Sequence, residues 1–576
     1  MTSFEIKAVP FDDGAMRVLA EVEPKLKNWP VVYTISDEKD IYIGETTNTT
    51  VRMNNHKGSL RKSHLKQVRI ILHDKFNKSA CLDLESHLIK YFHADQKYSV
   101  LNLNAGISES DYFGREEYRE SFKEIFEQLR EQGLMTRSIP DLVNSNIFKY
   151  SPFKALSSDQ AIAIEGILEC LMPSEGEKTS SKIVVQGGPG TGKTIVAVYL
   201  MKLIRDIATS LDGEVLEIDS LFSDYFQSGY REILESWKIG LVIPQQSLRR
   251  TIQNVFKSIP GLEKGMVLSP FEVGKSLERF DLLIVDEAHR LKLRSNMPSA
   301  AQNIDFKEIN ERLFGSDPDE KTQLDWVIKQ SEHQILLIDA EQSVMPSDLT
   351  ESAIRDLERE SQANKSYFKL LSQLRVKGGE NYINFVSELL AGSNSSNDKN
   401  FGDYDFKIFD DFASMNSELK VRETEKGLAR LVAGYAWKWV TKGITDPNVF
   451  DMDIDGTRLS WNRTAIDWIN SPTSINEVGS IHTVQGYDLN YCGVIIGRDL
   501  YFDEDSQAIR FDRKNYFDVK GMEKNKRLGR NYSDSDIEIY VKQIYRVLLT
   551  RGIYGTYVYV CDPKLSAYLK SVFSRN

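Results

Sequence analysis

The stretch KIVVQGGPGTGKTIVAVYL at residues 182–200 decides the fold of this chain. Its first five residues are a short, largely β-branched run that predicts a buried strand, and its last six predict the start of a helix. The eight residues between them fit the pattern G-x-x-x-x-G-K-[ST] at every fixed position. A glycine-rich loop between a strand and a helix binds polyphosphates, so the sequence predicts a nucleotide-binding α/β fold.

Each position of this loop has an expected role. Glycines let the backbone wrap closely around a polyphosphate and point its N–H groups inward. Lys193 is expected to reach the β- and γ-phosphates of ATP, and the hydroxyl of Thr194 to hold Mg²⁺. The predicted nucleotide contacts are Gly187, Gly188, Pro189, Gly190, Thr191, Gly192, Lys193 and Thr194.

A second buried strand ends in paired carboxylates, in the stretch FDLLIVDEAH at residues 280–289. Asp286 is expected to hold the Mg²⁺ shell, and Glu287 to orient or deprotonate the hydrolytic water. Two glutamines are further candidates for nucleotide contact. The amide of Gln160 suits the edge of adenine, and Gln342, which follows an apolar strand, is placed to sense the γ-phosphate.

Later motifs continue this series in a fixed order. They are QLR at residues 373–375, SIHTVQGYD at 480–488 and YRVLLTRG at 545–552. The series resembles the superfamily 1 helicases, and the stretch ARLVAGYAWKW at 429–439 makes it most similar to the Schlafen-like helicase group. The resemblance covers about residues 150–576 and implies two RecA-like parallel-sheet lobes with ATP in the cleft.

The helicase resemblance also implies roles for single residues. Arg375 and Arg551 would be arginine fingers that neutralise the phosphoryl transition state, and Gly486 would complete the nucleotide site. The remaining motif positions would contact a nucleic-acid strand, and these are Pro244, Gln245, Gln246, Ser247, Thr483 and Gln485.

The first hundred residues carry a separate set of motifs. Residues 31–35 and 41–43 predict two strands of a hairpin, and two helical stretches follow, one with Arg52 and His56 and one at residues 82–92 with Glu85. Together with Tyr33 and Tyr42, this set resembles the GIY-YIG nuclease family over residues 28–106. The chain departs from the family pattern in two ways, because the first motif lacks its leading glycine and the two tyrosines are closely spaced.

The GIY-YIG resemblance implies a catalytic role for each of these side chains. Tyr33 and Tyr42 would position or activate the attacking water, and Arg52 would stabilise charge on the scissile phosphate. His56 would transfer a proton or contact the phosphate, and Glu85 would hold a divalent metal, Mg²⁺ or Mn²⁺. The late asparagine of the family matches Asn102, with Asn104 as the alternative.

Length and composition set the limits of the prediction. The chain has 576 residues, which is too long for one core, and its four cysteines show no metal-binding spacing. We therefore expect free thiols in a cytoplasmic protein without a zinc site or a membrane span. The net charge is −11, yet residues 46–73 hold no acidic residue and six Lys or Arg, which favours a local nucleic-acid site.

The expected division is a GIY-YIG domain at residues 1–106, a helical linker at 107–150, a first RecA-like lobe at 151–345 and a second at 346–576. The predicted function is an ATP-dependent helicase or translocase coupled to a metal-dependent DNA endonuclease, in bacterial DNA processing or defence against foreign DNA. The alternative is an ATP-gated nucleic-acid clamp with an inactive nuclease module. RNA stays open as a substrate, and nothing in the sequence indicates an oligomer.

Overall fold

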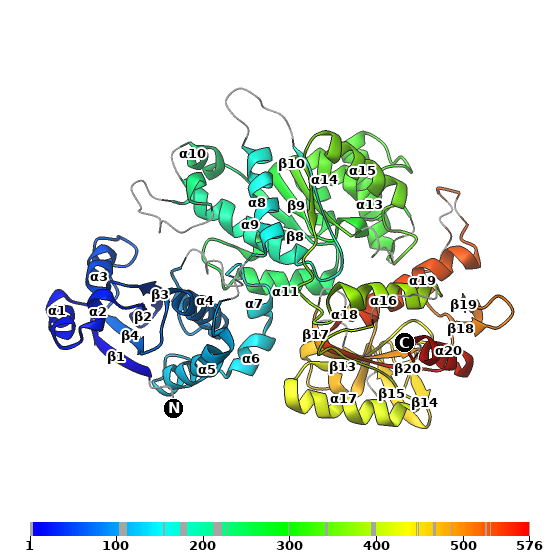
Figure 1. Ribbon diagram of the computed structural model, residues 1–576. Helices are drawn as coiled ribbons and strands as arrows, with labels where there is room; N and C mark the ends of the chain where they lie inside the picture. The colour runs from blue at the N-terminus through cyan, green and yellow to red at the C-terminus, as the bar shows by residue number, and fades with distance from the viewer. Residues whose placement is uncertain are drawn as a thin grey trace. The chain divides into compact units, whose positions relative to one another are not determined.

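The computed structural model of this protein describes most of the chain, and it forms two compact units that we consider one at a time (Figure 1). One unit comprises residues 1–165, 198–237 and 254–264, and the other comprises 166–197, 238–253 and 265–576. The described residues are 4–102, 112–153, 156–172, 181–210, 222–226, 229–295, 297, 299–339, 342, 344–392, 399–444, 446, 448–464, 468–484, 487–522, 524, 527–529 and 531–574.

A five-stranded sheet in the order β1-β4-β2-β3-β5 forms the centre of the first unit. Strands β2 and β3 make the predicted hairpin, in which Tyr33 lies opposite Gly44 and Ile35 opposite Tyr42. Strand β1 was not predicted, and it pairs antiparallel with β4. The bounds are β1 (Phe4–Pro10), β2 (Val31–Ser36), β3 (Asp40–Thr46), β4 (Gln67–His73) and β5 (Ser99–Val100).

The alternation of side chains along β2 and β3 gives this sheet two different faces. Tyr33 and Tyr42 share a core with α1 (Asp13–Val22), α2 (Lys25–Asn28) and α3 (Thr49–Lys57). Val32 and Ile43 lie on the opposite face and pack against α4 (Lys78–Asp95). The two predicted helices are therefore present, one on each face of the hairpin.

The predicted linker is helical, but it is not a free connector. Helices α5 (Arg115–Glu131), α6 (Ile139–Asn144) and α7 (Asn146–Lys149) contact α4. The reason is the apolar stripe of α5, which is buried in the same core as Val32 and Ile43 and consists of Phe122, Ile125, Phe126 and Leu129. Residues 112–150 thus extend the fold of the first unit.

The second unit contains a six-stranded parallel sheet in the order β11-β6-β10-β9-β7-β8. Strand β11 pairs with β6, so this sheet continues beyond residue 345, where the sequence analysis ended the first lobe. The strands are β6 (Lys182–Gly187), β7 (Ile239–Val242), β8 (Val267–Leu268), β9 (Phe280–Val285), β10 (Ser331–Ile338) and β11 (Tyr367–Leu370). In the chain they alternate with α8 (Ser158–Leu171), α9 (Lys193–Ala208), α10 (Tyr230–Glu235), α11 (Gln246–Phe256), α12 (Pro270–Lys275), α13 (Ala300–Phe314), α14 (Gln323–Gln330) and α15 (Glu351–Ala363).

A seven-stranded sheet of the same unit has the order β12-β20-β17-β13-β16-β15-β14 and is parallel except at the β14–β15 edge. Its strands are β12 (Asp405–Ile408), β13 (Ala429–Ala433), β14 (Met452–Ile454), β15 (Thr457–Trp461), β16 (Glu477–Gly479), β17 (Leu489–Ile496) and β20 (Gly552–Val560). The associated helices are α16 (Gly379–Ala391), α17 (Phe412–Lys426), α18 (Ile481–Val484), α19 (Asp534–Leu549) and α20 (Pro563–Ser574), and β18 (Leu500–Asp503) pairs with β19 (Ala508–Phe511). Two largely parallel sheets in one unit and a five-stranded sheet covered by helices in the other confirm the predicted α/β fold class.

Two smaller expectations also have an outcome. Cys81, Cys170, Cys492 and Cys561 are free thiols, as predicted. Within the described part of the chain, every helix is too short or too polar to cross a bilayer.

Candidate nucleotide and nuclease sites

The predicted phosphate loop joins the end of β6 to the start of α9. Its backbone enters the left-handed region at Gly190 and Gly192, with φ of 82° and 80°, which explains why glycine is required there. A side chain at Gly190 would also collide with Gln373, since an added Cβ would lie 2.1 Å from Gln373 Oε1. Both the backbone conformation of the loop and the lack of space for a side chain at Gly190 therefore explain its glycines.

Lys193 directs its ammonium group back into the loop. Its Nζ donates hydrogen bonds to the carbonyl oxygens of Gly187 and Gly188, at 2.7 and 2.9 Å, and lies 3.4 Å from Asp339 Oδ2. The side chain is buried, so this charge is held at the concave side of the loop at the N-terminus of α9. A cation and a helix N-terminus at one point make an anion-binding site.

Thr194 and Asp286 bring two oxygen donors together. Thr194 Oγ1 donates a hydrogen bond to Asp286 Oδ2 at 2.6 Å, across from α9 to the end of β9. A hydroxyl beside a carboxylate is the hard donor set that Mg²⁺ prefers, so these residues fit the expected metal. Burial, together with the charge of Glu287, raises the pKa of Asp286 above its usual value.

Glu287 has an unusual backbone and a specific partner. Its φ is 53°, in the left-handed region that only a few per cent of non-glycine residues adopt. Its Oε2 lies 3.2 Å from His289 Nε2, while His289 Nδ1 accepts the backbone N–H of Asp339 at 3.2 Å. His289 therefore carries its proton on Nε2, the ring nitrogen that faces the Glu287 carboxylate. Burial alone would raise the pKa of Glu287, but the adjacent imidazole of His289 and the nearby cations lower it overall.

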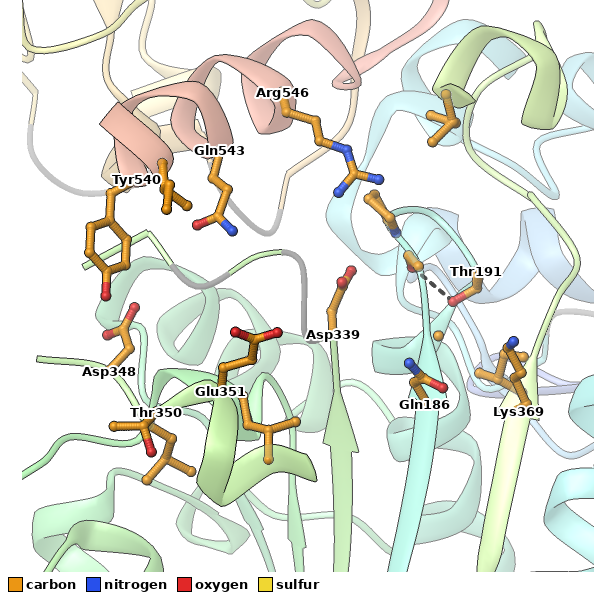
Figure 2. Close-up of a pocket in the computed structure, with 18 of the residues that line it drawn as sticks. Gln186, Thr191, Asp339, Asp348, Thr350, Glu351, Lys369, Tyr540, Gln543 and Arg546 are labelled. Atoms are coloured by element: carbon orange, nitrogen blue, oxygen red, sulfur yellow. Dashed lines mark hydrogen bonds between the residues drawn. The ribbon is translucent and has the colours of Figure 1, made fainter. Parts of the chain in front are cut away.

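A cavity of about 1020 Å³ opens beside this loop (Figure 2). Gly188 and Thr191 line it together with Asp339 at the end of β10. Figure 2 shows that Tyr540, Gln543 and Arg546 project into it from α19, where spacings of three residues place them on one helix face. Arg546 is a candidate site residue that the sequence analysis missed, although it stands within the motif that was quoted.

The two predicted arginine fingers are not among the residues that line this cavity. Helix α19 ends at Leu549, so Arg551 leaves the helix face that lines the cavity and is buried, with Nη1 donating to the Tyr487 carbonyl at 3.2 Å. Arg375 follows a segment that docks on the phosphate loop, but its guanidinium forms an ion pair with Asp488. The catalytic roles of Arg375 and Arg551 stay predictions, and Arg546 is the arginine that lines the cavity.

The predicted nucleic-acid contacts are largely engaged within the protein. Gln245 Nε2 donates to the carbonyl oxygen of His482 at 3.1 Å, and Ser247 is buried. Thr483 is also buried, and its hydroxyl donates to the Ser480 carbonyl at 2.9 Å. Of the others, Gln246 is exposed, Pro244 is half-buried, and Gln485 lies outside the described residues, as does the predicted nucleotide contact Gly486.

The two candidate glutamines have different surroundings. Gln160 on α8 is fully buried, and its Oε1 accepts the backbone N–H of Ser157 at 3.1 Å. Gln342 is buried beside Asp339, to whose carbonyl its N–H donates at 3.1 Å, and its Oε1 has no partner among the described residues. Contact of either glutamine with a nucleotide stays a prediction.

Four of the predicted nuclease residues meet on one face of the first sheet. Tyr33 OH is hydrogen-bonded to His56 Nε2 at 2.7 Å and accepts from Arg52 Nε at 3.2 Å. The ring of Tyr42 lies 4.8 Å from that of His56, measured between centroids. Gly44 makes room for this network, because an added Cβ would lie 2.3 Å from Tyr33 OH. Although the two tyrosines are closely spaced in the sequence, their side chains therefore lie together with those of Arg52 and His56.

The protonation state of His56 follows from this packing. Burial, with the charges of Lys62 and Arg52, lowers the pKa of His56 to about 2, so its ring is neutral at physiological pH. Lys62 was not predicted as a site residue, and its Nζ lies 3.5 Å from the centroid of the Tyr42 ring. The acid-free run of residues 46–73 was the signal that pointed to such a cation.

Glu85 and Asn102 come from other elements. Glu85 is half-buried on α4, the helix that covers the opposite sheet face, and its role as a metal ligand stays a prediction. Asn102 is buried and braces β3, because its Oδ1 accepts the N–H of Ile43 at 3.0 Å and its Nδ2 donates to the Ile43 carbonyl at 2.8 Å. The alternative, Asn104, lies outside the described residues.

One other group of potential metal ligands occurs in the described chain, at the turn of the hairpin. Atoms of Asp37, Asp40 and His64 lie within 4.8 Å of one another. Asp37 Oδ1 accepts the backbone N–H groups of Lys39 and Asp40, both at 2.7 Å, which explains its position as a turn residue.

The fold and these sites define a protein that combines a P-loop, helicase-like pair of parallel sheets with a small nuclease-type domain. The family comparisons agree. The model for the Schlafen group 3 DNA/RNA helicase domain matches residues 180–562, and that for the GIY-YIG catalytic domain matches residues 30–99. Since the first match spans most of the chain, the protein belongs to the Schlafen group 3 helicase-domain family.

Individual relatives are more distant. An uncharacterized protein of Saccharomyces cerevisiae is 25% identical over 416 residues, which cover 67% of this chain and 83% of that protein. Among solved structures, an arterivirus helicase, nonstructural protein 10, in complex with DNA matches with 11% identity and a TM-score of 0.26, over 71% of this chain and 65% of its own. Mss116p bound to single-stranded RNA and AMP-PNP matches with 12% identity and a TM-score of 0.26, over 78% and 77%.

Proposed function

We propose that this protein is an ATP-dependent nucleic-acid helicase or translocase coupled to a divalent-metal-dependent DNA endonuclease. The observation that carries the proposal is the bond between Thr194 and Asp286, with Lys193 and the Glu287–His289 pair beside it. These groups have the chemistry that hydrolysis of ATP requires. The chain also matches a DNA/RNA helicase domain and a GIY-YIG catalytic domain, which suggests that the energy of ATP hydrolysis is used to act on nucleic acid.

Each residue of the nucleotide site has a distinct task in this proposal. Thr194 and Asp286 would hold Mg²⁺, which supplies charge neutralisation on the phosphates when bound. Lys193 exchanges its loop carbonyls for phosphate oxygens. Glu287, kept ionised by His289, orients the attacking water and accepts its proton. Arg546, on the cavity-lining face of α19, offers the positive charge that the transition state needs.

The nuclease site uses neutral groups for proton transfer. His56 is uncharged and bonded to Tyr33 OH, so it is suited to accept the phenolic proton as Tyr33 activates or positions water. Arg52 reaches the same hydroxyl and carries a positive charge for the scissile phosphate. Glu85 would hold the divalent metal, whose chemistry is polarisation of the phosphate.

The experiment that tests this proposal is cleavage of plasmid and branched DNA, with Mg²⁺ or Mn²⁺ and with or without ATP. Wild type is compared with Glu85→Ala and Lys193→Ala. Cutting that is lost in Glu85→Ala and changed in Lys193→Ala supports a motor-coupled nuclease. Absence of cutting under all conditions, with nucleic-acid-stimulated ATP hydrolysis retained, contradicts it and favours the ATP-gated clamp. A strand-displacement assay separates the motor from that clamp, and RNA substrates in parallel decide between the two nucleic acids.

A further inference from the structure

An aromatic and basic loop leaves the carboxyl end of β13 and is not used by the sites described above. It runs through residues 434–450 to β14, and its described part exposes four large apolar side chains. The exposed fractions are 37% for Trp439, 50% for Val440, 40% for Ile444 and 37% for Phe450. Apolar groups gathered on one exposed loop mark an interaction surface more often than chance exposure does.

The loop is held in place by its surroundings. Asp451 accepts the backbone N–H and the hydroxyl of Thr441, at 2.8 and 2.6 Å, and also the backbone N–H of Trp461 on β15, at 2.7 Å. Arg463 donates to the Asp446 carbonyl at 2.6 Å. The exposed rings are thus presented from a braced backbone, which lowers the entropy lost when they bind a ligand.

A row of rings connects the exposed tip of this loop with α18. Trp439 lies 6.3 Å from Trp461, Trp461 lies 4.8 Å from Tyr435, and Tyr435 lies 5.7 Å from His482, between ring centroids. Both β13 and β16, which precede the loop and α18, end at the carboxyl edge of the same parallel sheet. Ligands bind at this edge in such sheets.

Two lysines give the surface its charge. Lys442 Nζ lies 5.2 Å from the Trp439 ring centroid, and Lys438 Nζ lies 5.7 Å from that of Phe517. Neither ammonium group forms an ion pair with a carboxylate of the described chain, whereas the exposed lysines Lys275 and Lys407 each contact an aspartate. The ammonium groups of Lys442, beside Trp439, and of Lys438, beside Phe517, are therefore available to an anionic partner.

We propose that this surface, formed by Lys438, Trp439 and Lys442, binds a single-stranded nucleic acid. A base stacks on the exposed part of the Trp439 indole, and the two ammonium groups contact the flanking phosphates. Aromatic stacking next to unpaired cations is how single strands are bound without sequence preference. The inference rests on the proposed function, since it gives the helicase domain a place for its strand. An acidic peptide would use the lysines, but it has no planar base to stack on the indole.

The test is fluorescence anisotropy of labelled dT20 and U20 with the full chain. Trp439→Ala is expected to weaken binding about 5- to 150-fold, the range measured for loss of one stacked base. Trp439→Phe keeps an aromatic face and is expected to lose far less. Lys438→Gln with Lys442→Gln should reduce the slope of log Kd against log salt by about 1.4, for two phosphate contacts on a single strand.

Tyr501→Ala provides the matched control, because Tyr501 is also 37% exposed and lies on β18 of the same unit. It is expected to bind like wild type. Affinity unchanged in Trp439→Ala, or lowered equally by Tyr501→Ala, overturns the inference while leaving the proposed function in place. If Trp439→Ala fails to fold, the double variant Lys438→Gln with Lys442→Gln provides the test. A slope of log Kd against log salt that equals the wild-type slope then overturns the inference. Wild-type protein that binds neither oligonucleotide refutes the proposed function itself.

Discussion

Gly44 offers the sharpest test of the nuclease site, because the structure gives a single steric reason for its glycine. Its φ is not in the left-handed region, so alanine is acceptable to the backbone. The added methyl carbon, however, would lie 2.3 Å from Tyr33 OH and 2.4 Å from Tyr33 Cζ, where contact needs more than 3.4 Å. Tyr33 is fully buried, so its ring must move by about 1 Å within a filled core, at a cost of about 1–3 kcal/mol.

This displacement should have two separable effects. The hydrogen bonds of Tyr33 OH to His56 and Arg52, at 2.7 and 3.2 Å, are expected to break, so DNA cleavage should fall at least about tenfold. Amides of β2 and β3 should exchange with D₂O about 5 to 150 times faster, which corresponds to the 1–3 kcal/mol lost. Hydrogen exchange on the full chain measures this locally, without assuming two-state unfolding of a multidomain protein.

Gly58→Ala is the control for this prediction. Gly58 ends α3 in the same domain, but its added Cβ would meet only Asn55 O at 3.5 Å, an ordinary contact. This variant should cleave and exchange like wild type, and ATP hydrolysis should be unchanged in both variants. The steric account of Gly44 would be refuted if Gly44→Ala cleaved DNA at the wild-type rate with unchanged exchange in β2 and β3.

Four further outcomes are expected. Lys193→Ala should reduce ATP hydrolysis to background in a phosphate-release assay, because the loop loses its only lysine, and retained turnover would contradict the assignment. Glu85→Ala should abolish DNA cleavage but not ATP hydrolysis, and strong cutting by this variant would rule out Glu85 as the metal ligand. His289→Ala removes the imidazole whose closeness offsets the burial of Glu287, so the pKa of Glu287 should rise. The acidic limb of the ATPase pH profile should then move to higher pH rather than stay fixed. The pKa of His56 is about 2 in the folded state and near 6.5 in the unfolded state, so below pH 6.5 the unfolded state binds an extra proton. The free energy of unfolding should therefore fall below pH 6.5, by up to about 1.4 kcal/mol per pH unit. His56→Gln should show a smaller drop in Tm between pH 7 and pH 5 than wild type, and an equal drop would exclude His56 as the source of the acid sensitivity.

Elements that depend on local pattern could be predicted from the sequence. The hairpin around Tyr33 and the strand before Gly187 follow from alternation and β-branched runs, and both are present. Strand β11 was missed because its four residues carry no strong pattern and are fixed only by pairing with β6. The packing partner of α5 could not be predicted for a related reason, since an apolar stripe does not reveal which core it joins.

A sequence motif alone does not determine which of two nearby arginines lines the cavity. The motif at residues 545–552 contains both Arg546 and Arg551, and resemblance favoured Arg551. Which of them lines the cavity depends on where α19 ends, and helix ends are set by capping and tertiary contacts within one or two residues. Because α19 ends at Leu549, Arg546 shares a face with Tyr540 and Gln543, while Arg551 lies beyond it. A shift of one helical turn would have reversed this assignment.

The end of β10 shows a contact that no side-chain pattern could reveal. Asp339 reaches Lys193 through its carboxylate, but it fixes His289 through its backbone N–H, which any residue except proline supplies. That N–H sets the tautomer of His289, whose Nε2 then lies 3.2 Å from the Glu287 carboxylate and helps to lower the pKa of Glu287. Under the proposed function, the lysine that would contact phosphate and the glutamate that would activate water are thus joined through Asp339. A change in the position of β10 relative to the loop would alter both at once, which offers a physical route by which closure around ATP can be linked to its hydrolysis.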